Sequence, residues 1–376
     1  MTDLIVFGED WGGHPSSTMH LISHLPGRNR VVWVNSIGLR RPRLTSADIR
    51  RALRKLASAF RQRVPRPSVP PPGPVVQPLV LPMAVSRAGR ALNRALLAHS
   101  VGGAARAEGF IRPVLWVSLP SAVDAVGALG EAAVVYYAGD DFGALAGVDH
   151  ERCLDMEAEL ATHADLILAA SPAIAARFPA AKTHVLPHGV DFRLFSSPAP
   201  RPADLPAGKV AGFYGTLASW LDYDLIAATA RLLPDWRFVF IGPEGSDVAR
   251  ADLALLRAQP NVTLLGPRPH AALPGYAQHW TAGLIPFRDT AQIRASNPLK
   301  LREYLAAGRP VVATPFPALA PYAPHLAVAT TARGFARALQ TSVGDTGAAA
   351  RRAAVAGESW QARAAKAGAL IRALVG

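Results

Sequence analysis

Short apolar runs alternate along the chain with segments whose apolar residues recur at helical spacing. In the first half, the runs predict strands at residues 4–7, 31–35, 114–118, 133–137, 165–170 and 184–186. After a proline-rich stretch, they predict strands at residues 210–214, 238–241, 262–265, 282–286, 310–313 and 326–329. Because apolar strands that alternate with helices form parallel sheets covered by those helices, we predict an α/β chain with two doubly wound domains.

The same pattern gives the expected domain boundaries. We predict a first domain at residues 1–195, a linker at 196–208, a second domain at 209–345, and one or two helices at 346–376. Ligands of doubly wound sheets bind beyond the carboxyl ends of the strands. We therefore expect the functional site in a cleft between the two domains.

Composition narrows the class of protein. The chain has 376 residues and a formal net charge of +13, which favours an anionic partner. Its basic residues are neither spread along a domain nor interleaved with aromatic residues, so we expect no nucleic-acid partner. A single cysteine, Cys153, excludes a disulfide framework, and the absence of residue clusters at metal-ligand spacing predicts neither a metal nor another cofactor. Without a signal-peptide pattern or an apolar run of about 20 residues, we expect a cytoplasmic protein.

Most of the net charge lies in one segment. Residues 40–66 hold ten Lys or Arg residues and one Asp. Within it, residues 46–63 place apolar side chains at helical spacing opposite the basic ones, which predicts a basic amphipathic helix. Such a helix either lies on an anionic membrane as a peripheral contact or packs on the core with a solvated basic face. The sequence leaves both interpretations open.

The segment around Lys300 has the strongest chemical signal. Asn297 is predicted to cap a helix, Pro298 to begin it, and Gly308 to end it before a buried strand. Lys300 then lies in the first turn, where the helix dipole favours an anion, and Glu303 lies one turn later on the same face. A cation there can hold a diphosphate and the carboxylate can accept both hydroxyls of a ribose, although spacing alone equally fits a surface ion pair.

The run from Pro298 to Thr314, PLKLREYLAAGRPVVAT, resembles the nucleotide-sugar-binding signature of GT-B glycosyltransferases of the family 4-like, group 1 type. Further runs resemble the nucleotide domain, the hinge and the final helix of that family, namely 212–217, 238–243, 261–266, 283–287, 186–191 and 359–363. The resemblance covers nearly the whole chain. It implies a GT-B fold in which the first domain binds the acceptor, the second binds a nucleotide-sugar donor, and the C-terminal helix crosses back onto the first domain.

The resemblance also assigns residues to the donor. Gly215 and Thr216 would let backbone amides approach the phosphates, Lys300 would neutralise them, and Glu303 would hold the ribose. Other motif positions complete the donor set: Gly242, Asn297 and Leu299.

Two positions depart from the family pattern. Ala295 stands where the family usually has a Glu, and Thr216 stands where it tends to have an Arg. Arg294 and Arg302 are candidates to replace the missing positive charge. Each of them also fits a solvated arginine at a helix end.

Two acids follow a predicted strand of the first domain. Asp140 and Asp141 come soon after the strand at 133–137, so they lie at a carboxyl end of the sheet. A carboxylate there can act as general base on an acceptor hydroxyl, and the resemblance favours Asp140 over Asp141. Either residue also fits a helix cap. Whether transfer retains or inverts the configuration at the anomeric carbon stays open.

The loop after the first predicted strand is expected to contact the acceptor. Trp11 can pack on a sugar face, and Gly12 and Gly13 allow close approach. His14 is a candidate for proton transfer, and it equally fits a structural hydrogen-bonding role.

The sequence therefore predicts an enzyme, a hexosyl- or related glycosyltransferase. It would move a sugar from a nucleoside diphosphate donor to a hydroxyl of a glycan or lipid-linked acceptor, in surface polysaccharide or glycolipid synthesis. Two alternatives remain, a nucleotide-sugar epimerase of the same fold and a non-catalytic nucleotide-sugar-binding or membrane scaffold protein.

Overall fold

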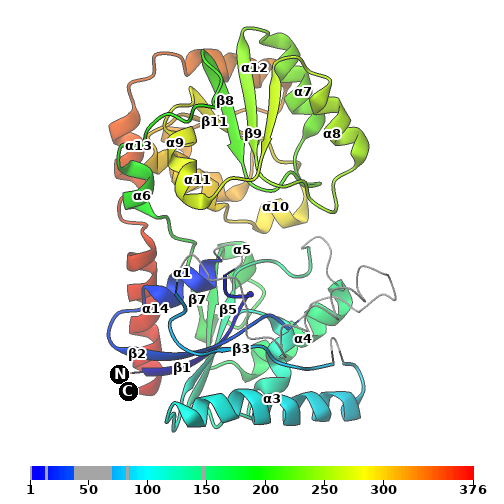
Figure 1. Cartoon of the computed structure of the whole chain (residues 1–376), viewed down its shortest axis with the longest axis vertical. Coiled ribbons are helices and arrows are strands. Elements are labelled where there is room, and N and C mark those ends of the chain that lie inside the picture. Colours follow the sequence, from blue (N-terminus) through cyan, green and yellow to red (C-terminus); the bar gives the residue numbers. More distant parts are fainter. Residues whose placement is uncertain (1, 13–15, 38–69, 82–83, 145–148) are drawn as a thin grey trace. The chain divides into compact units, whose positions relative to one another are not determined.

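The computed structural model describes residues 2–12, 16–37, 70–81, 84–144 and 149–376. Contacts divide the chain into two compact units. Unit 1 comprises the residues up to Pro187 together with Arg363–Gly376, and unit 2 comprises His188–Ala362. Each unit holds a parallel sheet with helices against it, as the apolar pattern predicts (Figure 1). The predicted helix at 46–63, Gly13 and His14 lie outside the described residues.

The described part of unit 1 is built on a parallel sheet in the order β3-β2-β1-β4-β5-β6-β7. Its strands are Thr2–Phe7 (β1), Asn29–Val34 (β2), Val75–Val76 (β3), Val114–Val117 (β4), Ala133–Ala138 (β5), Leu166–Ala169 (β6) and Thr183–Val185 (β7). Its helices are Ser17–Ser23 (α1), Arg87–Ala107 (α3), His150–His163 (α4) and Pro172–Ala175 (α5), with 3₁₀ turns at Pro120–Ala125 (η1) and Ala180–Lys182 (η2). The apolar runs predict all of these strands except β3, a two-residue strand at the edge of the sheet.

Unit 2 is built on a parallel sheet in the order β10-β9-β8-β11-β12-β13. Its strands are Lys209–Tyr214 (β8), Trp236–Ile241 (β9), Val262–Gly266 (β10), Ala282–Ile285 (β11), Val311–Ala313 (β12) and Ala327–Val328 (β13), all of them predicted. Its helices are Phe192–Ser196 (α6), Tyr223–Leu232 (α7), Arg250–Arg257 (α8), Leu273–Ala277 (α9), Ala291–Ala295 (α10), Leu299–Ala306 (α11), Ala332–Thr341 (α12) and Ala348–Val355 (α13), with 3₁₀ turns at His270–Ala272 (η3) and Pro317–His325 (η4). The last helix, Trp360–Val375 (α14), begins in unit 2 and ends in unit 1.

The boundary between the units differs from the expected domain boundary. The division falls after Pro187 rather than at residue 195, and the expected linker at 196–208 packs on unit 2. The Ala199 N–H donates to Gln278 at 2.9 Å, and the Asp204 carboxylate pairs with Arg268 at 2.8 Å. These contacts make the proline-rich stretch a part of unit 2.

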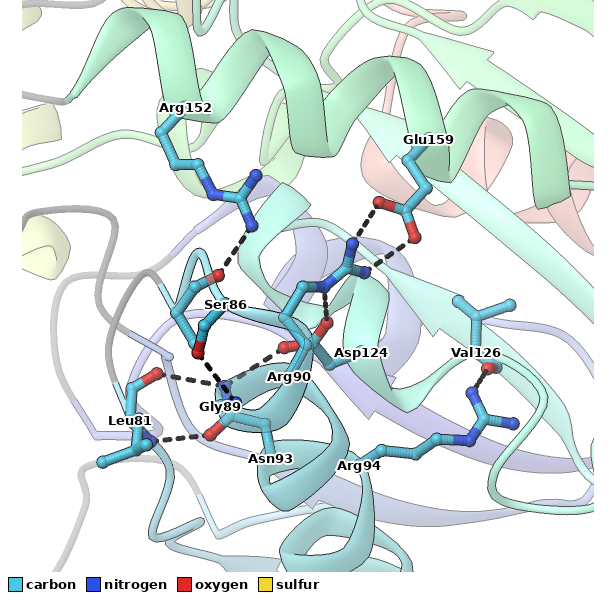
Figure 2. Close-up of polar contacts among 11 residues, drawn as sticks. Leu81, Ser86, Gly89, Arg90, Asn93, Arg94, Asp124, Val126, Arg152 and Glu159 are labelled. Atoms are coloured by element: carbon cyan, nitrogen blue, oxygen red, sulfur yellow. Dashed lines mark hydrogen bonds and ion pairs between the residues drawn. The ribbon is translucent and has the colours of Figure 1, made fainter.

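A cluster of polar side chains joins α3 to η1 and α4 inside unit 1 (Figure 2). Arg90 donates to Asp124 at 2.6 Å and to the two oxygens of Glu159 at 2.7 and 2.8 Å. Asn93 donates to the other oxygen of Asp124, and both ends of its amide bind the backbone of Leu81. Because Asp124 is buried, these partners satisfy a charge that would otherwise be costly, and they fix α3 and the segment before it.

Candidate functional site

The segment around Lys300 meets the end of β8 in unit 2. Lys300 lies in the first turn of α11, as predicted. Gly215 directly follows β8, and a side-chain carbon built on it would come 3.2 Å from both Cε and Nζ of Lys300. The ammonium group is thus held against the backbone at the carboxyl end of the sheet, where doubly wound sheets bind ligands.

Two glycines, each directly after a strand, lie close together beside Lys300. Gly215 has φ +131° and Gly242 has φ +143°, and a side-chain carbon on Gly242 would come within 2.1 Å of the Gly215 oxygen. Both positions therefore require glycine. The N–H of Gly215 donates to Ile241 and that of Gly242 donates to Gly266, so neither is free for a phosphate. Within the described chain, the N–H of Thr216, the residue after Gly215, has no hydrogen-bond partner, so it remains available to an anion.

The Lys300 ammonium lies in apolar surroundings. Its Nζ is 5.0 Å from the ring centre of Phe213 and 5.2 Å from that of Phe287. Removal from water lowers the pKa of Lys300 to about 8, although the charge of Glu303 partly opposes this shift. The amine is therefore mostly protonated at pH 7, and a bound anion would raise its pKa again.

Glu303 is buried and bonded through both carboxylate oxygens. Its Oε2 accepts a hydrogen bond from the Tyr214 hydroxyl at 2.7 Å, and its Oε1 lies 3.1 Å from Nε2 of His270. Tyr214 ends β8 and His270 begins η3, so three separate elements meet at this carboxylate. The sequence analysis missed His270, because nothing in a loop 33 residues before Glu303 indicates that the two side chains meet.

The start of α11 differs from the prediction. The helix begins at Leu299, Pro298 occupies the cap position, and no side chain caps it. Asn297 instead accepts a hydrogen bond from Arg302 at 2.5 Å. The expected capping role of Asn297 is therefore wrong, because Arg302 takes up its side-chain oxygen. Gly308 ends the helix as predicted, with φ +77°.

The two candidate replacement cations also have other partners. Arg302 is 4% exposed and donates to Glu358 at 2.5 Å, so it is neither a phosphate ligand nor a solvated residue. Both interpretations of Arg302 are wrong, because a structural ion pair occupies its guanidinium. Arg294 is exposed and pairs with Asp289 at 2.6 Å, which fits the interpretation as a solvated residue at a helix end.

The two acids of unit 1 lie in different surroundings. Asp141 pairs with Arg177 at 2.6 Å and accepts the Gly143 N–H at 3.0 Å. Arg177 also pairs with the buried Glu157, so Asp141 is part of a structural network of ion pairs. Within the described chain, no hydrogen-bond partner contacts Asp140. The next described helix, α4, is capped by Asp149, so neither candidate acid caps it.

Asp140 has the raised pKa that a general base needs. Its surroundings raise the pKa to about 6, through removal from water first and then through the charges of Glu9 and Asp141. The residue is exposed, and the charges of the two neighbouring carboxylates disfavour its ionised form there. Sequence reasoning missed Glu9, which follows β1 at the same edge of the sheet and has one buried oxygen without a hydrogen-bond partner among the described residues. Its position after a strand is the signal that could have found it.

The loop after β1 differs from the expectation for Trp11. This side chain is 7% exposed and packs edge-to-face on Trp33, with ring centres 4.8 Å apart. Its ring therefore belongs to the core of unit 1 and offers no open face for a sugar, which corrects the expected stacking role. Gly12 has φ +87°, so it supplies the turn after Trp11.

Comparison with known proteins relates these elements to a family. Residues 208–345 match the family model "Glycosyl transferases group 1". This chain has the GT-B fold. The structure of Anabaena HepE in complex with UDP and glucose is similar over 99% of this chain and 100% of HepE, with TM-score 0.68 and 15% identity. WaaG, a glycosyltransferase involved in lipopolysaccharide biosynthesis, is similar over 100% of this chain and 98% of WaaG, with TM-score 0.57 and 14% identity.

A curated relative is similar over a shorter stretch. It is the Bacillus subtilis (strain 168) protein named "Putative teichuronic acid biosynthesis glycosyltransferase TuaH", with 37% identity over 140 residues. The match covers 36% of this chain and about a third of the length of TuaH.

The structure adds two observations on metals and membranes. Among the described residues, no group of three or more His, Cys, Asp or Glu side chains is arranged to hold a metal ion. In the same part of the chain, none of the helices combines the length and apolar character needed to span a membrane.

Proposed function

We propose that this protein is a glycosyltransferase that moves a sugar from a nucleoside diphosphate donor to a hydroxyl of a glycan or lipid-linked acceptor. The observation that carries the proposal is the grouping of Lys300, Thr216 and Glu303 at the carboxyl end of the unit 2 sheet. It combines a cation and an unpaired amide, suited to a diphosphate, with a carboxylate suited to a ribose. The group 1 family match over the same unit supports this assignment.

In this mechanism, unit 2 binds the donor and unit 1 supplies the base. Lys300 and the Thr216 amide stabilise the negative charge that develops on the diphosphate as the bond to the sugar breaks. Asp140 accepts the proton of the acceptor hydroxyl as it attacks the anomeric carbon, which is the role that an inverting transfer requires. Its pKa of about 6 keeps it mostly ionised, and able to take up that proton, near neutral pH.

Incubation of the purified protein with a panel of nucleoside diphosphate sugars tests this function, with and without a membrane lipid extract. We expect release of nucleoside diphosphate that depends on the extract. An isomerised donor without any acceptor would instead indicate an epimerase. Binding without turnover under all conditions would indicate a scaffold protein.

We further propose that the protein docks on an anionic membrane, which would bring it to a lipid-linked acceptor. The basic segment 46–63 is one element of this proposal. The chain also has no Asp or Glu between residues 49 and 107, where it has eleven Lys or Arg residues. A membrane surface rich in anionic lipid complements this charge.

A described apolar surface of unit 1 supports the membrane contact. Leu92 and Leu96 lie one turn apart on α3 and are 48% and 36% exposed, on the side opposite the buried Leu97 and Val101. The preceding segment adds Leu81, which is 47% exposed and whose backbone is held by Asn93 (Figure 2). We call Leu81, Leu92 and Leu96 the α3 face. It lies within the acid-free part of the sequence.

Sedimentation with lipid vesicles tests the docking. The wild-type protein should bind vesicles rich in anionic lipid, and less so as salt is raised. Leu92→Glu should weaken this binding by roughly tenfold, because it places a carboxylate in the apolar contact. The matched control is Ile111→Glu, which adds the same charge at a residue 87% exposed beyond the far end of α3, and it should bind like wild type. Equal binding of the wild type to neutral vesicles would contradict the proposal.

A further inference from the structure

Both oxygens of the Glu303 carboxylate already have a hydrogen-bond partner within the protein. The Tyr214 hydroxyl donates to Oε2, and the His270 ring meets Oε1. Each carboxylate oxygen has two acceptor positions, so each keeps one for a further donor. The two protein contacts therefore fix the plane of the carboxylate and leave one acceptor position on each oxygen.

His270 is itself held from the other side by an aromatic residue. Phe195 of α6 is fully buried and meets the His270 ring edge-to-face at 5.6 Å between ring centres. The same Phe195 ring stacks on Tyr214 at 6.3 Å. One buried side chain thus supports both residues that hold the Glu303 carboxylate, which gives the arrangement the second layer of contacts that a precise site needs.

The charges around His270 favour its protonated form. Burial alone lowers the pKa of His270, but the hydrogen bond and the charge of Glu303, with a contribution from Asp191, raise it above the ordinary value of 6.5. The titratable groups whose charges act on the ring come from two elements: Glu303 on α11 and Asp191, which caps α6. A protonated imidazole donates from both nitrogens, so it always presents an N–H to Glu303.

We propose that His270 is a positioning residue of the donor site, holding the Glu303 carboxylate in the plane that accepts the two hydroxyls of a donor ribose. The inference rests on the proposed function, because it concerns the nucleotide of the same donor. When His270 loses its proton, the neutral ring keeps an N–H on Nε2 in one tautomer only. Deprotonation therefore loosens Glu303 and weakens donor binding as the pH rises.

Titration calorimetry with two ligands separates positioning from a merely structural role. UDP carries both ribose hydroxyls, whereas 2′,3′-dideoxy-UDP carries neither. His270→Ala should weaken UDP binding by roughly tenfold and leave the binding of the dideoxy ligand nearly unchanged. An equal loss for both ligands would overturn the proposal, since His270 would then act on the fold and not on the ribose contact.

Two further variants sharpen the test. Tyr214→Phe removes the contact to the other Glu303 oxygen and should show the same dependence on the ribose hydroxyls. His270→Gln keeps a side-chain N–H without a titratable ring, so it should restore most of the UDP affinity of wild type. It should also remove the part of the decline in that affinity that follows loss of the His270 proton above pH 6.5, and a decline as steep as in wild type would overturn the role of the His270 proton.

The failure of this inference is distinguishable from the failure of the proposed function. Both ligand forms are also measured with ADP and GDP in place of UDP. If the wild type binds none of the three nucleoside diphosphates, the proposed function fails and the inference fails with it. If the wild type binds one of them and His270→Ala binds it equally well, only the inference is overturned.

Discussion

The candidate donor site of unit 2 and the acid site of unit 1 are built in opposite ways. In unit 2, the Glu303 carboxylate has a protein partner on each oxygen, and Lys300 lies between two aromatic rings. In unit 1, Asp141 is closed into an ion pair, whereas Asp140 has no hydrogen-bond partner in the described chain. A binding group gains from being fixed before its ligand arrives, whereas a proton acceptor must keep its oxygens open to the hydroxyl that it deprotonates.

The pKa of the cation is lowered in one site, and the pKa of the acid is raised in the other. Desolvation lowers the pKa of Lys300 to about 8, and desolvation with neighbouring acids raises that of Asp140 to about 6. Each shift brings the pKa of the group closer to 7, so its protonation state responds more readily to a bound substrate. The comparison predicts that the two sites respond to different measurements, one to donor affinity and the other to turnover.

The strongest test of this difference between the two sites is to neutralise Asp140 and Asp141 one at a time. Asp140→Asn should lower turnover by about 10²- to 10⁴-fold with a free energy of unfolding no lower than that of wild type, because it removes the base and no structural contact. Asp141→Asn should lower the free energy of unfolding by about 1–3 kcal/mol, because it breaks the pair with Arg177. Steady-state kinetics and urea unfolding of both variants check these outcomes. Retained turnover in Asp140→Asn would reject its role as base.

This division between the two acids shows where sequence reasoning stops. The strands follow from apolar runs, so twelve strands and the position of Asp140 after β5 could be predicted. Adjacent acids after one strand look alike in sequence, because the partner that distinguishes them, Arg177, lies 36 residues away. Long-range side-chain pairs have no local pattern, and the same reason hid His270 and made Arg302 look like a surface residue.

Local chemistry was most readable around Lys300, where the motif is continuous. Helix geometry alone puts Lys300 in the first turn and Glu303 one turn later, and the structure keeps both positions. The cap was misjudged because Asn297 has a stronger partner in Arg302 than the free amides of the helix. Trp11 was misjudged because a large aromatic residue beside glycines fits an open loop and a core contact equally well.

The next largest effect should come from the donor cation. Lys300→Ala should weaken binding of UDP by roughly 10- to 100-fold, since it removes the positive charge next to the Thr216 amide. The matched control is Arg294→Ala, which removes a cation six residues earlier that already pairs with Asp289 at the surface. Calorimetry should find the control within twofold of wild type. Unchanged binding in Lys300→Ala would refute the role of Lys300 and remove the contrast with the unit 1 site.

The smallest effect should be the pH dependence of donor binding. In the free protein Lys300 loses its proton as the pH rises through about 8, whereas a bound diphosphate keeps it protonated. Binding therefore takes up a proton, and UDP affinity should fall between pH 7 and 9 by up to about tenfold. In Lys300→Arg the guanidinium stays charged over this range, so the step of the decline near pH 8 should disappear. A decline of the same size in Lys300→Arg would show that another group titrates, and the lowered pKa of Lys300 would then have no part in donor binding.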